Sequence, residues 1–517
     1  MEGDIELKNG SALRVEPLAT GSANDAYGSV TLRQKNQLDR YINFFSSVAF
    51  STCLLASWEG AGGSLLSGLF NGGPAVIVYG IILSTIGNLT IACSLAELAS
   101  IHPTAGAQYH WTYFLAPRGK RFLSFFQGWV TVFAWAAGSC VAPFFVGNQI
   151  QGLVVLAHPE YELVRWRGTL LMWLIALVPL TMNVFARRLL GSIEIVAGIM
   201  HVVFLPVTIA VLVTLAPRNP DEFVWNTFVS GLSGWTDPGV VFSIGLLGVL
   251  TPLGGIDGVI HMAEEVKNAK VVIPRSMIWG TLINGVFAFC YLITILYCMG
   301  DYTEALTTPT GFPIIQIAYQ ATGSKTVTFV LMALGMMPGW IALFNSYASV
   351  TRLTWAFARD NGLPFSDFFA VVDPTYKIPI RALCLVASCL FGLSFIQIGS
   401  TAAFNAILSL GTLGLYISYL IPLVLLVYKR FTSPRDIPQG SFTMGKFGLA
   451  VNLVAILFTS YFVVFLPFPP SLPVTAENMN YAGPVLGFVM LFACVDWVVR
   501  GRHKWQGPAL RAYGRED

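Results

Sequence analysis

Two carboxylates of this chain lie inside long apolar segments, and each lies beside a run of glycines. Glu59 belongs to residues 57–63 (SWEGAGG), and Asp257 belongs to residues 251–258 (TPLGGIDG). An ionised carboxylate is costly at membrane depth, so such an acid usually faces a cavity, where it holds a cation or a proton. Glycine-rich breaks free backbone polar groups, which a bilayer tolerates only beside protein or water. Two matched breaks therefore predict the substrate site of a secondary transporter built from inverted repeats.

The first break offers backbone and hydroxyl groups to a ligand. Gly60, Gly62 and Gly63 are expected to expose amides at the N-terminus of a half-helix, where the helix dipole attracts an anionic group. The hydroxyl groups of Ser57 and Ser64 lie in the same stretch. Close helix packing is the alternative explanation of these glycines, because small residues are common where membrane helices touch.

Glu59 is the most informative residue of the chain. It has no Lys or Arg neighbour in its own apolar segment. Two active roles follow: counter-ion for a cationic amine, or a group that takes up and releases a proton. A neutral acid that braces the break through hydrogen bonds is the structural alternative. Trp58 next to it either attracts an ammonium group through its ring face or serves in packing.

The second break carries Asp257, for which hydrogen bonding to freed backbone amides and contact with substrate are both open. Thr251, Gly254 and Gly255 of the same stretch are expected to line the substrate site. Trp135 and Asn345 are polar or aromatic residues at membrane depth, and either lining the site or packing explains each of them.

His201 lies within the fifth apolar segment. A buried neutral histidine with one hydrogen bond is the structural explanation, and a proton sensor is the functional one.

Beyond the second break, we expect an inner gate or loop network that joins acidic and imidazole side chains to basic ones: His261, Glu264, Glu265, Lys267, Lys270 and Arg275. No phosphate-binding loop, nucleophile elbow, dinucleotide fingerprint or Cys/His metal pattern is present, so we expect neither a cofactor nor a metal, and no enzyme.

The elements that position these residues are long apolar helices. The 517 residues are 55% hydrophobic and 11% charged, which is typical of a membrane protein, and the net charge of +3 does not indicate nucleic-acid binding. The sequence predicts an all-α protein with twelve transmembrane helices, since each apolar run approaches the length that crosses the bilayer. The predicted segments are 42–69, 75–97, 122–156, 168–186, 194–216, 240–263, 276–299, 325–356, 380–398, 402–428, 447–467 and 482–499. The third is long enough to predict a strongly tilted helix.

The distribution of basic residues predicts the orientation. Of the 30 Lys and Arg residues, four (Arg165, Arg167, Arg218 and Lys325) fall in predicted outer segments and the other 26 on the inner side. The positive-inside rule therefore places both termini in the cytoplasm. Residues 1–38 are predicted to form a disordered cytoplasmic tail, and 500–517 a cytoplasmic C-terminal tail. All eight cysteines lie in apolar runs and are expected to be reduced.

Two halves follow from this topology. The transporter core is expected over 39–430, with one five-helix repeat at 42–216 and a second at 240–428, while 431–499 supplies helices 11 and 12. Because five is odd, the second half must have the opposite orientation in the membrane. Each half then begins with its broken helix, which is helix 1 or helix 6.

Four further motifs carry a family resemblance. They lie at 96–111, 257–275, 355–364 and 472–481, and each follows or precedes a predicted span. Together they resemble the fungal amino acid/choline permeases of the amino acid–polyamine–organocation superfamily. The resemblance implies the leucine-transporter fold, alternating access, and proton-driven uptake of a small amine or amino acid, such as 4-aminobutyrate or choline. It also places His201 near the position where related carriers hold a coupling group.

The resemblance implies location in the plasma membrane, with the vacuolar or another internal membrane as the alternative. One departure is residues 250–252 (LTP), where related carriers often have an aromatic gate. The alternatives for function are transport of an amine-bearing secondary metabolite in either direction and, from another class, a channel or a nutrient sensor. Two broken helices in one chain favour a carrier over a channel.

The charge distribution generates the first testable prediction. Tags fused to both termini should be protected from external protease in intact cells, whereas a tag in the 467–481 loop should be cleaved. Immunoblotting before and after detergent permeabilisation measures both. Cleavage of the N-terminal tag in intact cells would contradict the orientation and the inverted repeat together.

Overall fold

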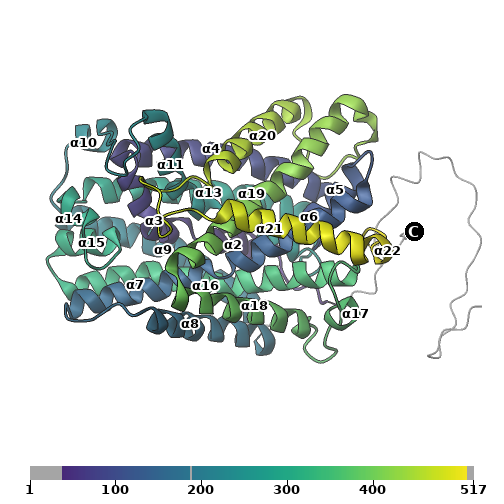
Figure 1. Ribbon diagram of the computed structural model, residues 1–517, viewed down its shortest axis with the longest axis horizontal. Helices are drawn as coiled ribbons and strands as arrows, with labels where there is room; N and C mark the ends of the chain where they lie inside the picture. The colour runs from purple at the N-terminus through teal and green to yellow at the C-terminus, as the bar shows by residue number, and fades with distance from the viewer. Residues whose placement is uncertain (1–37, 187–188, 509–517) are drawn as a thin grey trace, which may run out of the picture. The chain divides into compact units, whose positions relative to one another are not determined.

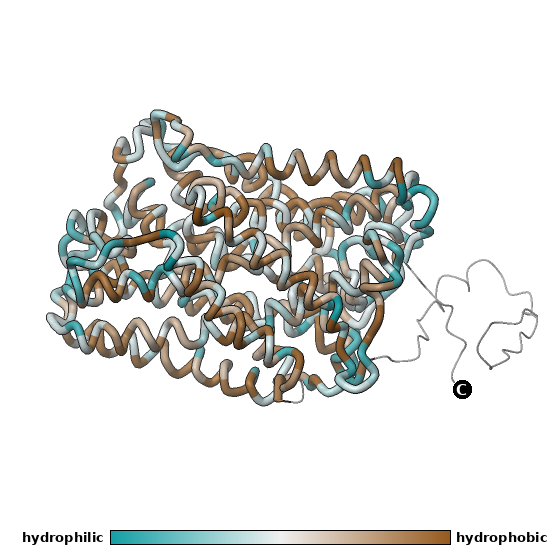
Figure 2. Tube along the Cα trace, turned by 60° about the horizontal axis from the view of Figure 1, so that its bottom comes forward, coloured by the Kyte–Doolittle hydropathy of each residue, from teal (hydrophilic) through white to brown (hydrophobic). Residues whose placement is uncertain are grey.

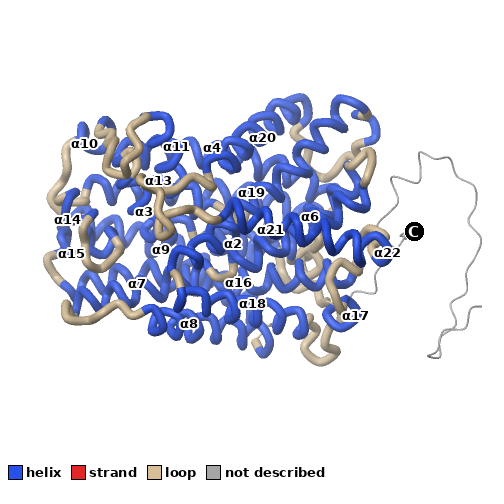
Figure 3. The backbone as a smooth tube through the Cα atoms, viewed as in Figure 1, coloured by secondary structure: helices blue, strands red, loops and turns tan. Residues whose placement is uncertain are grey.

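The computed structural model describes residues 38–186 and 189–508, and within them every regular element is a helix (Figures 1 and 3). The all-α prediction is therefore confirmed for the described part of the chain. The predicted N-terminal tail before residue 38 and the last part of the predicted C-terminal tail, from residue 509, lie outside the described residues.

The helices follow one another along the chain with short connections. The first half contains α2 (Phe44–Leu55), α3 (Ser57–Phe70), α4 (Gly73–Ile101), α5 (Gln108–Leu115), α6 (Lys120–Gly138), α7 (Val141–Ala157), α8 (Arg165–Phe185), α9 (Leu190–Leu215) and α10 (Asp221–Asn226). The second half contains α11 (Pro238–Leu250), η2 (Thr251–Leu253), α12 (Gly258–His261), α13 (Ala269–Tyr297), α14 (Tyr302–Leu306), α15 (Pro313–Thr322), α16 (Lys325–Arg359), α17 (Ser366–Phe369), α18 (Ile380–Gly399) and α19 (Thr401–Thr432). The last part contains η3 (Pro434–Asp436), η4 (Gly445–Phe447), α20 (Gly448–Phe465), α21 (Ala482–Asp496), η5 (Trp497–Gly501) and α22 (Arg502–Lys504).

Eleven helical segments of the described chain are long and apolar enough to cross a membrane. The first predicted span is absent from the eleven because it is divided into α2, with 12 residues, and α3, with 14. Hydrophobic residues follow the lengths of the helices and hydrophilic residues gather near their ends (Figure 2). This distribution is the one expected when lipid surrounds the helices and water meets their ends.

The two ends of the helix bundle carry different short helices. The α5 side carries α5 and α17, and the α15 side carries α10, α14 and α15 (Figure 1). The first and last described segments are both at the α5 side: Leu38 packs with Ala105 and Trp355, and Trp505 packs against Tyr109.

The first predicted break is real, but it is at Ala56 and not in the glycine run. Ala56 has left-handed backbone angles (φ 42°, ψ 50°) between the end of α2 and the start of α3. Gly60, Gly62 and Gly63 lie inside α3, so the prediction that they form the unwound stretch is wrong. Left-handed backbone costs an L-residue roughly 1–2 kcal/mol, and fixed hydrogen bonds must offset that cost.

Asn284 of α13 supplies those hydrogen bonds. Its amide nitrogen donates to the carbonyl of Thr52 in α2 (2.9 Å), and its amide oxygen accepts from the backbone N–H of Ser57 in α3 (3.0 Å). The Ser57 hydroxyl donates back to the carbonyl of Asn284 (2.8 Å). One buried side chain thus satisfies backbone groups on both sides of the break, as the membrane interior requires.

The second break is a longer unwound stretch. Helix α11 passes into the 3₁₀ turn η2, and residues 254–257 are non-helical before the single turn of α12. Gly255 has φ +94°, a conformation that side-chain-bearing residues rarely adopt. The two breaks meet, because a Cβ atom on Gly60 would lie 3.3 Å from Cβ of Pro252 in η2.

The third predicted span is also not one helix. Helices α6 and α7 meet at Ser139 and Cys140, so the expected single tilted helix is corrected to two consecutive helices. All eight cysteines are free, as expected. The start of the predicted C-terminal tail is packed: Trp505 is buried among Tyr109, Phe125 and Phe357.

The Asn284 bridge generates a prediction. Asn284→Ala should lower the free energy of unfolding by about 2 kcal/mol, since it leaves the buried N–H of Ser57 without a partner and removes one hydrogen bond to the Thr52 carbonyl. It should also lower uptake per folded carrier, because the break loses its support. Melting in detergent and uptake normalised to folded protein are the measurements.

Asn183→Ala is the matched control. Asn183 also donates to two backbone carbonyls, those of Pro179 and Phe344, but away from both breaks. It should lower the melting temperature without lowering uptake per folded carrier. Normal uptake by folded Asn284→Ala would show that another group holds the break.

Candidate functional site

A cavity of about 210 Å³ lies between the two breaks. Its walls come from the α2–α3 break, α6, α7, the α11–η2 break, α16 and α19, and they include Ala56, Glu59, Gly60, Trp135, Phe145, Thr251, Pro252, Gly255, Ser346, Thr412 and Tyr416. The volume is below the ~300–1,000 Å³ of pockets for drug-sized ligands, so it suits a small solute. Glu59 is the only charged residue among the described residues that line it.

The carboxylate of Glu59 is not alone. Its Oε1 lies 2.7 Å from Nδ1 of His201 in α9, and both side chains are buried. The two residues named separately as proton-coupling candidates thus form one pair. The His201 ring stacks on Phe287 (5.3 Å between ring centroids), and its backbone carbonyl accepts from the indole N–H of Trp58 (3.3 Å).

Two polar atoms of this pair have no hydrogen-bond partner among the described residues: Oε2 of Glu59 and Nε2 of His201. A second cavity of about 30 Å³ borders Glu59 and is also lined by Trp58, Thr208 and Tyr291. A cavity of this size is large enough to hold water. Glu59 therefore stands between a solute-sized cavity and a water-sized one.

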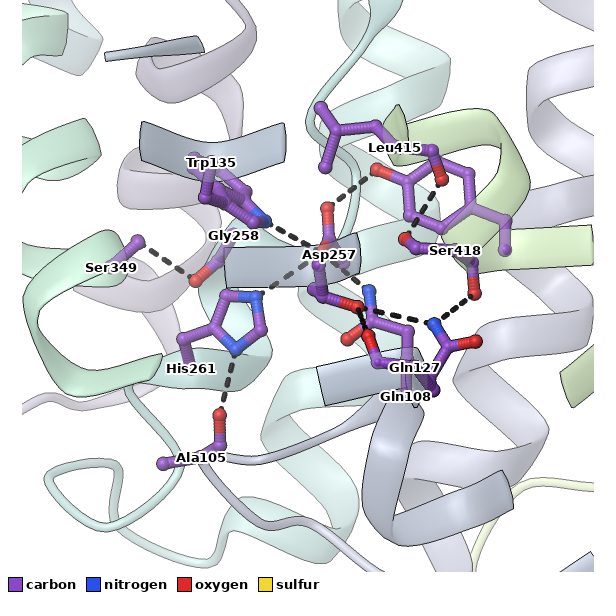
Figure 4. Close-up of polar contacts among 12 residues, drawn as sticks. Ala105, Gln108, Gln127, Trp135, Asp257, Gly258, His261, Ser349, Leu415 and Ser418 are labelled. Carbon is purple, nitrogen blue, oxygen red and sulfur yellow. Dashed lines mark hydrogen bonds and ion pairs between the residues drawn. The ribbon is translucent and has the colours of Figure 1, made fainter. Parts of the chain in front are cut away.

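Asp257 of the second break is at the centre of a buried network (Figure 4). Its Oδ2 accepts from Gln108 of α5 (2.5 Å), Trp135 of α6 (2.9 Å) and His261 of α12 (3.1 Å). Its Oδ1 accepts from the hydroxyl of Tyr419 in α19 (2.5 Å). Four side chains from four helices therefore satisfy this carboxylate. Its partners are not freed backbone amides, and it does not line the large cavity.

His261 completes the network with two acceptors. Its Nδ1 faces the carbonyl of Ala105 (2.8 Å) and its Nε2 faces Asp257. The ring of His261 thus ties the second break to the connection between α4 and α5, where Ala105 lies.

Comparison with known proteins identifies the family. The chain matches the amino acid permease family over residues 42–491. The chain belongs to this family.

Three curated relatives show how far the similarity of this permease extends. It is 32% identical over 495 residues to a choline transporter of Saccharomyces cerevisiae, covering 93% of this chain and 85% of that one. It is 32% identical over 437 residues to a putative amino acid/polyamine transporter of Macrophomina phaseolina (84% and 96%), and 29% identical over 486 residues to amino-acid permease 2 of Neurospora crassa (92% and 86%). The resemblance found in the four sequence motifs is confirmed, and the protein is a multi-pass membrane permease, not an enzyme.

The structure brings most of the predicted site residues of the permease together. The large cavity is lined by Glu59, Gly60, Gly63, Ser64, Trp135, Thr251, Gly254 and Gly255. Gly62 and Trp58 line the small cavity instead. Ser57, Asp257 and Asn345 line neither; each is occupied by hydrogen bonds to other parts of the chain.

Several residues of the site were missed from the sequence. Asn284 supports the first break, Gln149 lines both cavities, and Gln108 and Tyr419 hold Asp257. Polar residues inside predicted spans were the available signal for Asn284 and Gln149, but nothing in the spacing showed which helices would meet.

The α5 side of the permease is closed by ion pairs. Glu265 pairs with Arg352 (2.7 Å) and Glu264 with Arg359 (2.6 Å), both arginines of α16. The prediction that Lys267, Lys270 and Arg275 would pair with these acids is wrong. Helix α16 packs against α12 and supplies the arginines instead. Burial raises the pKa of Tyr109 in α5 well above its usual range, so its hydroxyl stays protonated and donates to Asp360.

The Asp257 network predicts a separation between assembly and affinity. Asp257→Asn should lower the amount or maximal rate of folded permease, because one carboxylate that accepts four hydrogen bonds is lost. The KM should change by less than about threefold, because Asp257 does not line the cavity. Uptake kinetics per folded carrier measure both. A KM increase of about tenfold, equivalent to ~1.4 kcal/mol, would show that Asp257 contacts the solute after all.

Proposed function

We propose that this permease is a secondary active transporter for a small solute that bears an ammonium group, such as an amino acid, 4-aminobutyrate or choline, and that protons drive it. The observation that carries the proposal is the Glu59–His201 pair, placed at a helix break and bordering a cavity of solute size. The named functions of the relatives, choline transport and amino acid transport, agree with this solute class.

The chemistry of the cavity suits a cation. Glu59 supplies the single negative charge among the described lining residues, and Trp135, Phe145 and Tyr416 supply aromatic side chains. An ammonium group gains both Coulomb attraction and cation–π attraction in such a site. The first turn of α3 also borders the cavity through Ala56 and Gly60, and its partial positive charge would suit the carboxylate of an amino acid.

The charge of the pair depends on one proton. With neutral His201 donating its Nδ1–H to Glu59, the pair carries one negative charge. A proton added at Nε2 makes the pair neutral and weakens its attraction for an ammonium group. His201 thus tunes the affinity of Glu59 for the ammonium group through the charge of the pair.

Alternating access follows from the arrangement of the breaks. The cavity lies between the two broken helices, and ion pairs close the α5 side. Rocking of α2–α3 and α11–α12 against the rest would open that side, as inverted repeats allow. We propose that α2 and α3 together form one span, which brings the total to twelve. We further propose that the α5 side is cytoplasmic and that the protein resides in the plasma membrane or, as the alternative, in the vacuolar or another internal membrane.

Replacing Glu59 tests the proposal. Glu59→Gln keeps the shape and removes the charge, so the KM for a cationic solute should rise by about tenfold or more, equivalent to ~1.4 kcal/mol. Uptake of labelled choline, 4-aminobutyrate and amino acids in permease-deficient yeast measures it. Glu304→Gln is the control, because Glu304 is an exposed acid of α14 far from the cavity, and its KM should stay within about twofold.

The second arm of this test is His201→Gln. It should flatten the pH dependence of the KM, which in the wild type should rise as the pH falls. If Glu59→Gln leaves affinity, accumulation and pH profile unchanged, Glu59 is a structural residue and the assigned site is wrong.

A further inference from the structure

The proposed symport raises a conflict at Glu59. A proton and an ammonium group both neutralise the same carboxylate, so each weakens the binding of the other at the Glu59–His201 pair. Symport needs the opposite, since the proton and the solute must be bound at the same time. A second proton-binding group is therefore required, close enough to couple to the pair and outside the solute cavity.

Glu194 of α9 is a buried carboxyl that lines neither cavity and does not contact Asp257. It is 2% exposed, and it forms no ion pair with any described residue. Its Oε2 accepts from the side-chain amide of Asn345 in α16 (2.7 Å). Its Oε1 has no hydrogen-bond partner within the described chain. An ionised carboxylate with one donor would be strongly unfavourable at this depth, whereas a carboxyl group carrying a proton on Oε1 is neutral.

Glu194 lies on the same face of α9 as His201. The two residues are seven positions apart, which is two helical turns and roughly 10 Å along the axis. Glu194 is the nearer of the two to the α5 side, because α9 begins there at Leu190. Cys53 of α2 lies close enough to interact electrostatically with both Glu194 and Glu59. Glu194 and Glu59 are therefore both within electrostatic reach of the same thiol of α2.

The contacts favour a proton over a metal cation as the ligand. The Asn345 amide nitrogen donates to Glu194 and also to the backbone carbonyl of Phe50 in α2 (3.3 Å). These two oxygens, which a cation would need as ligands, face an N–H donor instead. A divalent cation such as Ca²⁺ or Mg²⁺ takes six or more oxygen ligands, and within this Glu194–Asn345 contact the side-chain oxygens without a donor are Oε1 of Glu194 and Oδ1 of Asn345.

The other titratable groups around Glu194 leave it as the acid free to exchange a proton. From α2 the neighbour is Cys53, and before α2 the ring of Tyr41 lies beside Gly191. From α16 the nearest titratable residues are Tyr347, which packs in a separate cluster with Cys140, and Arg352, which pairs with Glu265. Helices α13 and α15 bring Tyr291 and Tyr319 toward the other half of α9, where Tyr291 and α15 border the small cavity.

We propose that Glu194 binds the co-transported proton while Glu59 holds the ammonium group of the solute. The proton is carried as an O–H on Oε1, and it leaves to water when the α5 side opens and solvates the carboxylate. Asn345 is a positioning residue: it ties Glu194 to α2, so that movement of the first broken helix changes the surroundings of the carboxyl. This inference rests on the proposed proton-driven transport and names the group that carries the proton.

The test uses the full-length permease in proteoliposomes. Glu194→Gln keeps the amide contact and removes the titratable group. Exchange of labelled for unlabelled solute should persist, whereas solute-coupled proton entry, followed with a pH dye, should fall to background, and a pH gradient should no longer concentrate the solute. Glu59→Gln should behave differently, with a raised KM and retained proton entry at saturating solute.

The outcomes separate this inference from the proposed function. A wild-type protein that moves no protons with solute would overturn proton coupling itself. Coupled proton entry in Glu194→Gln equal to that of the wild type would overturn the role of Glu194 alone. If Glu194→Gln fails to assemble, Glu194→Asp decides: coupling should persist with the pH midpoint of uptake displaced and the KM unchanged, and an undisplaced midpoint would refute the proposal.

Discussion

The cost of leaving polar groups without partners in the membrane interior governs this structure. A helix break at membrane depth exposes backbone N–H and C=O groups, and these must be satisfied by other parts of the protein. Asn284 does this at Ala56, and the network around Asp257 fixes the surroundings of the second break. Because the supporting side chains come from helices outside the breaks, the cavity is held by the whole bundle, not by the broken helices alone.

The same cost sorts the buried acids into different states. Asp257 has four hydrogen-bonding side-chain partners. Glu59 has one basic partner and an open oxygen facing cavities. Glu194 has a single amide donor. The three residues show a graded supply of partners, and the two least satisfied ones are those to which we assign the ammonium group and the proton.

Much of the fold could be predicted from the sequence, because long apolar runs and glycine-rich breaks have direct physical meanings. Glu59 and the cavity-lining part of the second break were found in this way. The register of the first break was not, since the glycines of α3 are compatible with a helix and Ala56 carries no signal of its own. The partners of Asp257 and the pairing of Glu59 with His201 depend on which helices meet, and one sequence does not contain that information. Glu194 was overlooked although it is an acid at the start of a predicted span.

Glu59 borders both cavities, and this shared wall constrains how the permease can diversify. Any change to its side chain alters the solute space and the water-sized space at once. Ser346 of α16 and Thr412 of α19 differ from Glu59, since they border only the larger cavity. Substitutions on α16 and α19 can therefore reshape the larger cavity while Glu59 on α3 and its partner His201 on α9 stay as they are. A family that keeps one fold and transports many substrates is the evolutionary outcome that such a division favours.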